Sequence, residues 1–91
     1  MAVIDIRRPH GGDPKATRAA VERVARSIAT DYGIAHHWTG DELHFDRSGV
    51  KGHIAIEPAD VHVHIELGFL LGAMKPRIER EIGRKLDEYL A

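Results

Sequence analysis

The segment GHIAIEPADVHVHIE, residues 52–66, contains two runs in which apolar and polar side chains alternate on either side of a turn. A period of two is typical of a β-strand with one face on a hydrophobic core, and Pro58-Ala59-Asp60 supplies residues that favour a turn. Further turn signals precede this segment at short spacing, at Gly40-Asp41 and Ser48-Gly49. Residues 34–67 are therefore predicted to form a four-stranded antiparallel meander.

The segments on both sides of the meander carry signals of their own. Residues 2–8 alternate like a strand, whereas residues 76–90 place apolar side chains at helical spacing. Another helix is predicted to begin after Asp13, which can accept hydrogen bonds from first-turn amides, and to end at Gly33, which favours a left-handed cap. Two amphipathic helices and a sheet with one apolar face can bury that surface together only as a two-layer sandwich. We expect one α+β domain over residues 1–91, in the order β-α-β-β-β-β-α, with a mainly antiparallel sheet and both helices on one face.

Two-residue turns would fix the register of the meander. Leu43 then lies opposite Ile54, and Ile54 lies opposite Ile65, so that the apolar side chains share one face of the sheet. A slip of one residue would turn the apolar set of a strand to the wrong face. The place of the first strand stays open, because it can pair in parallel beside residues 34–39 or antiparallel beside residues 61–67.

The same register predicts a row of three histidines and one carboxylate across the polar face of the sheet. Its members are His37, His44, His53 and Glu66. Directly opposed side chains lie about 4.5 to 5.5 Å apart at Cβ, so neighbouring imidazoles can converge on one divalent metal ion. Solvated strand faces also carry such residues as ordinary cross-strand pairs. The row is either a metal site or a set of such pairs.

Composition restricts the functions that the chain can have. Thirteen Lys and Arg against fourteen Asp and Glu leave a formal charge of -1, so no strong field attracts nucleic acid or anionic lipid. The absence of cysteine excludes disulfides, thiolate catalysis and cysteine-based zinc sites. No secretory signal is recognisable, and the longest nearly apolar run, residues 67–74, is shorter than the ~20 residues of a membrane span. We expect a cytoplasmic protein with no nucleic-acid partner and no membrane span.

Enzyme chemistry has no clear sequence signature in this chain. Ser27 falls within a predicted helix and Ser48 in a turn, and neither has the context of a nucleophile elbow. The stretch GGDPKAT, residues 11–17, lacks the Gly-Lys-Ser/Thr ending of a phosphate-binding loop. We therefore expect a protein without catalytic residues and without a cofactor.

The run LGFLLGAM, residues 67–74, places large apolar side chains around two glycines where a polar loop is expected. Burying one large apolar side chain contributes ~1.5 to 3 kcal/mol, so exposing all of them would cost a large part of the stability of a small domain. This apolar elbow either folds over the open end of the sandwich or meets a partner, an apolar ligand or an apolar surface. The candidate contact residues are Phe69, Leu70, Leu71 and Met74.

A family resemblance runs through nearly the whole chain and rests on the order and spacing of short motifs. The motifs are Ile4-Asp-Ile6, Arg8, His10, Tyr32-Gly33, Trp38-Thr-Gly-Asp41, Leu43-His-Phe45, Gly49-Val-Lys-Gly52, Leu67-Gly68, Leu70-Leu71, Lys75, Ile78-Glu79, Ile82 and Leu86-Asp87. In these the chain resembles the bacterial polyhydroxyalkanoic acid system proteins. The resemblance implies a non-catalytic cytoplasmic protein linked to polyester storage, bound to the granule or to a granule-associated protein.

Two other functions stay open at this point. The helices and the curved sheet could hold an apolar or acyl ligand between them, or the histidine row could bind a metal. Edge strands and an open sheet face are also compatible with a homodimer.

Overall fold

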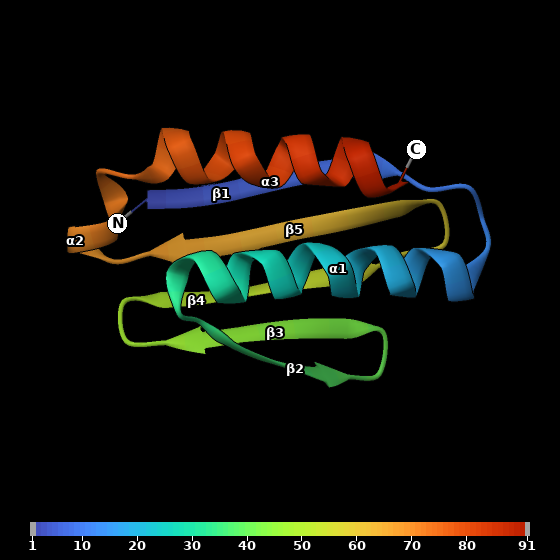
Figure 1. The fold of residues 1–91 in the computed structure, drawn as a ribbon, viewed down its shortest axis with the longest axis horizontal. Coiled ribbons are helices and arrows are strands. Elements are labelled where there is room, and N and C mark those ends of the chain that lie inside the picture. Colours follow the sequence, from blue (N-terminus) through green and yellow to red (C-terminus); the bar gives the residue numbers. More distant parts are fainter. Residues whose placement is uncertain (1, 91) are drawn as a thin grey trace.

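The computed structural model describes residues 2–90, apart from the side chain of Leu70. It contains a five-stranded antiparallel sheet with two long helices on one of its faces, as Figure 1 shows. The predicted α+β class, the order of the elements and the placement of both helices are confirmed. A four-residue helix after the last strand is an addition to that prediction. The elements are β1 (Ala2–Pro9), α1 (Pro14–Tyr32), β2 (Ala35–Thr39), β3 (Glu42–Arg47), β4 (Val50–Ile56), β5 (Asp60–Leu67), α2 (Phe69–Gly72) and α3 (Lys75–Leu90).

Both ends of α1 are set by the residues that the sequence indicated. The Asp13 carboxylate accepts hydrogen bonds from the amides of Lys15, at 3.0 Å, and Ala16, at 3.4 Å. These amides have no partner within the helix, so the cap satisfies them. Gly33 ends the helix in the left-handed conformation, at φ 63° and ψ 40°.

The sheet has the strand order β1-β5-β4-β3-β2, which settles the place of the first strand. β1 pairs antiparallel with β5, and Ile4 lies opposite Ile65. Both strands contain eight residues, so their apolar positions match along the full length of the pair. Consequently β1 and β2 are the two edges of the sheet, and α3 lies over β1 (Figure 1).

The predicted register between β4 and β5 is wrong by two residues. Ile54 lies opposite Val63, not opposite Ile65. The chain turns at Pro58-Ala59, and the Glu57 amide donates a hydrogen bond to the Asp60 carbonyl at 2.8 Å. Proline has a fixed φ and no N–H, so it suits the corner of a turn better than a paired position. A shift of two residues leaves every side chain on its predicted face.

The core lies between the apolar face of the sheet and the two long helices. Leu43 and Ile54 are fully buried, Ile65 is nearly so, and Trp38 packs against them from β2. The predicted common face is therefore confirmed. The helices contribute the buried residues Thr17, Ala20, Val21, Val24, Ala25 and Ile28 from α1, and Ile78, Ile82, Gly83, Lys85 and Leu86 from α3.

Polar contacts also join α1 to α3. Lys85 is buried, and its ammonium group donates to Ser27 and, at 3.1 Å, to Asp31. Glu81 accepts a hydrogen bond of 2.8 Å from the Tyr32 hydroxyl. Burial and the neighbouring Glu81 carboxylate raise the pKa of Tyr32 to about 12. The two helices are thus held in register by one buried cation and one tyrosine.

Candidate functional site

The face of the sheet opposite the helices carries a continuous cluster of imidazoles, which we call the histidine face. Its members come from four neighbouring strands and are His37, which is exposed, and His44, His53, His62 and His64, which are half-buried. The ring centroids are 5.5 Å apart for His37 and His44, 5.9 Å for His44 and His53, 5.8 Å for His53 and His64, and 6.4 Å for His62 and His64. The predicted neighbours His37/His44 and His44/His53 are confirmed as directly opposed pairs.

The predicted place of Glu66 opposite His53 in the row is wrong. Because of the shifted register, His53 lies opposite His64, whereas Glu66 lies opposite Lys51. Within residues 2–90, no group of three or more histidine, aspartate or glutamate side chains is arranged to hold a metal ion. The geometry therefore supports the reading of the row as cross-strand pairs.

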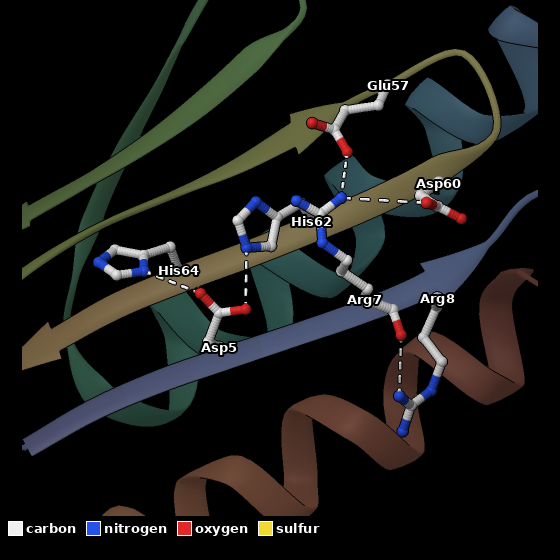
Figure 2. A network of polar contacts seen from close by, with 7 residues as sticks. All are labelled: Asp5, Arg7, Arg8, Glu57, Asp60, His62 and His64. Atoms are coloured by element: carbon white, nitrogen blue, oxygen red, sulfur yellow. Dashed lines mark hydrogen bonds and ion pairs between the residues drawn. The ribbon is translucent and has the colours of Figure 1, made fainter.

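Asp5 links two members of the histidine face, as Figure 2 shows. His62 Nε2 donates to one carboxylate oxygen at 3.0 Å, and His64 Nδ1 donates to the other at 3.2 Å. The hydrogen bonds from His64 and His62 lower the pKa of Asp5 below its ordinary value of 3.8. Sequence reasoning missed this residue, because Asp5 meets the histidines only once β1 is placed beside β5.

We expect the Asp5 contacts to make stability fall in strong acid. A carboxyl whose pKa is lowered by folding stabilises the folded state above its unfolded pKa, and this contribution is lost as pH falls through the folded value. Below about pH 4, the urea midpoint of the wild-type protein should therefore fall more steeply than that of Asp5→Asn, which keeps the shape but does not titrate. Parallel midpoint curves for the two proteins between neutral pH and about pH 2 would contradict the role of Asp5.

The apolar elbow at the end of the sheet divides into buried and exposed side chains. Leu67 is 1% exposed, and Leu71 and Met74 are half-buried and pack against the core. Phe69, in contrast, is 93% exposed. The side chain of Leu70, the fourth predicted contact residue, lies outside the described residues. Most of the elbow thus covers the open end of the sandwich, and Phe69 points away from it.

Backbone contacts hold Phe69 in this position. The Gly68 amide donates to the Gly49 carbonyl in the β3–β4 turn at 2.7 Å, and the Gly72 amide donates to the Gly68 carbonyl at 2.8 Å. The exposed aromatic ring therefore lies on a short helix that is tied to the sheet. In Figure 1 this helix, α2, lies at the same end of the molecule as the β3–β4 turn.

An apolar cavity lies beneath Leu71, between the helices and the sheet. Tyr32, Phe45 and Ile78 are among its lining residues, and its volume is about 20 Å³. That space holds about one water molecule. It is too small for an acyl chain, so the cavity gives no support to an apolar ligand between helices and sheet.

No helix in residues 2–90 is long and apolar enough to cross a membrane.

The comparisons with known proteins give one match. Neither a curated protein nor a solved structure is significantly similar to the chain. The profile of the family described as "Putative polyhydroxyalkanoic acid system protein" matches residues 4–90, which is nearly the entire sequence of 91 residues. The chain belongs to the polyhydroxyalkanoic acid system protein family.

Proposed function

We propose that this protein is a non-catalytic cytoplasmic protein that associates with polyhydroxyalkanoate granules, or with proteins on them, through Phe69. The family supplies the polyester context. The observation that supports this contact is the 93% exposure of Phe69 in an elbow whose other described large side chains are buried or half-buried. A folded domain gains nothing in its own core from an aromatic ring in this position.

The chemistry of the contact is the transfer of one ring from water to an apolar surface. Full burial of a phenylalanine side chain contributes about 1.5 to 3 kcal/mol, which corresponds to roughly a 10- to 150-fold gain in affinity. Gly68 and Gly72 fix the short helix by backbone hydrogen bonds, so little conformational freedom remains to be lost on binding. A polyester surface offers such an apolar environment, and so does an apolar pocket on a granule protein.

The test is cosedimentation with purified granules. Phe69→Ser should weaken binding by at least about tenfold, because it removes the exposed ring without opening the core. The matched control is Val3→Ser, since Val3 is the other exposed large apolar side chain among the described residues, at 40%. Val3→Ser should bind like the wild-type protein.

Two further measurements separate the outcomes. Unchanged binding by a folded Phe69→Ser variant would refute the contact. Repeating the assay with granules stripped of protein distinguishes the two targets, because binding to the polyester itself should survive stripping, whereas binding to a granule protein should be lost.

A further inference from the structure

The outer edge of β1 carries backbone groups that pair with no other strand of the described sheet. The His10 amide donates to the Ala59 carbonyl on the β5 side at 3.0 Å, in the same ladder as the rest of β1. Backbone groups in a strand point alternately to its two sides. Those of the even-numbered residues therefore face β5, whereas those of Val3, Asp5 and Arg7 face outward. This edge is a template for one additional strand.

A groove runs along this edge, between β1 and α3. Its volume is about 790 Å³, which lies within the range of about 300 to 1,000 Å³ that is typical of binding sites. The lining residues on β1 are Asp5, Ile6, Arg7 and Arg8. On α3 the buried Gly83 leaves room for Arg8, since a Cβ at this glycine would lie 3.3 Å from the Arg8 guanidinium.

Arg8 joins the two sides of the groove. Its Nε donates to Asp87 on α3 at 2.8 Å, and its Nη1 donates to the outward carbonyl of Arg7 at 3.0 Å. Figure 2 shows this side chain reaching from β1 toward α3. The outward amides of Asp5 and Arg7 and the Asp5 carbonyl stay open to an incoming strand.

The groove is lined by four arginines and three carboxylates, namely Arg7, Arg8, Arg80 and Arg84 against Asp5, Glu79 and Asp87. The Asp5 carboxylate contacts His62 and His64 on the histidine face. Asp87 is neutralised by Arg8 at 2.8 Å, and Glu79 lies 3.9 Å from Lys75. Within residues 2–90, Arg80 makes no ion pair, and Arg84 has only a contact of 3.9 Å with Glu88. Both arginines line the groove and can meet carboxylates on a bound segment.

We propose that the groove between β1 and α3 binds an extended acidic segment of a partner protein, which pairs with β1 as a sixth strand. Main-chain hydrogen bonds to Asp5 and Arg7 supply affinity for any extended segment. Arg80 and Arg84 select for acidic side chains on the α3 side. This interaction is independent of Phe69, which lies on a different element.

Selection from a library of random peptides displayed on phage, with the full chain as the target, tests the proposal. Enrichment of acidic peptides is the expected result. On addition of a selected peptide, the outward amides of Asp5 and Arg7 should become protected from hydrogen exchange. The amides of Ile4 and Ile6, which already face β5, should change little.

Charge reversal tests the selectivity. Arg80→Glu should weaken binding of the selected peptide by at least about tenfold. Lys15→Glu is the matched control, because Lys15 is an exposed cation with no ion pair among the described residues and lies outside this groove. The proposal is overturned if no peptide is enriched, if the enriched peptides are not acidic, if protection maps to another surface, or if Arg80→Glu and Lys15→Glu bind equally well.

Discussion

Leu86→Ala is expected to lower the free energy of unfolding by about 2 to 5 kcal/mol. Leu86 is fully buried, at 0% exposure, on the face of α3 that packs on the sheet. The substitution removes buried apolar groups and leaves a cavity, because the surrounding side chains close it only in part. A domain of this size has a total stability of about 5 to 15 kcal/mol, so one substitution removes a large share of it.

Urea unfolding followed by circular dichroism measures this loss. Arg84→Ala is the control on the same helix, since Arg84 is exposed and its contact with Glu88 is 3.9 Å long. Its effect should stay within about 0.5 kcal/mol. A loss of less than about 1 kcal/mol for Leu86→Ala would mean that α3 does not pack on the sheet as described.

The second large effect is expected at Gly52, in the middle of β4. A Cβ at this position would lie 2.8 Å from the His64 carbonyl oxygen and 2.8 Å from Ile65 Cγ1. The carbonyl belongs to the backbone of β5, so it cannot rotate away, and two central strands must separate to admit a methyl group. Gly52→Ala should therefore cost about 3 kcal/mol or more, at the upper end of overpacking effects.

A second glycine substitution serves as the control for this prediction. Gly11 has no atom within 4 Å of the position of an added Cβ, so Gly11→Ala should be neutral within about 0.5 kcal/mol. Thermal or urea unfolding of the two variants should separate them clearly. Equal stability of Gly52→Ala and the wild-type protein would show that β4 and β5 are not as close as the structure has them.

Local patterns were sufficient to predict the main elements of the fold. The alternation along residues 52–66 is a property of each strand by itself, and Asp13 and Gly33 act on the backbone next to them. The common apolar face was predictable for the same reason, because a shift of two residues does not change it. The exact register depends on whether the turn is centred on Pro58-Ala59, as observed, or on Ala59-Asp60, and the sequence is compatible with both.

Contacts between segments distant in the sequence were less predictable. Asp5 meets His62 and His64 because β1 crosses to the far side of β5, and the sequence allowed two places for β1. The helical pattern alone suggests that Lys85 is a surface residue. In the structure it is buried and donates to Asp31 on α1. The elbow was correctly identified as apolar, but its division depends on a four-residue helix too short to have a periodic signal.

The hydrogen bond between Gly68 and Gly49 has a mechanical consequence. Force on α2 reaches the sheet along the chain through β5 and across this bond through the β3–β4 turn, so it is distributed over three neighbouring strands. A pull along the strands would load their ladders in shear, with many bonds strained together, instead of opening them one after another from an edge. A protein held through α2, as the proposed contact of Phe69 requires, would thus resist being unfolded by a pull on its attachment.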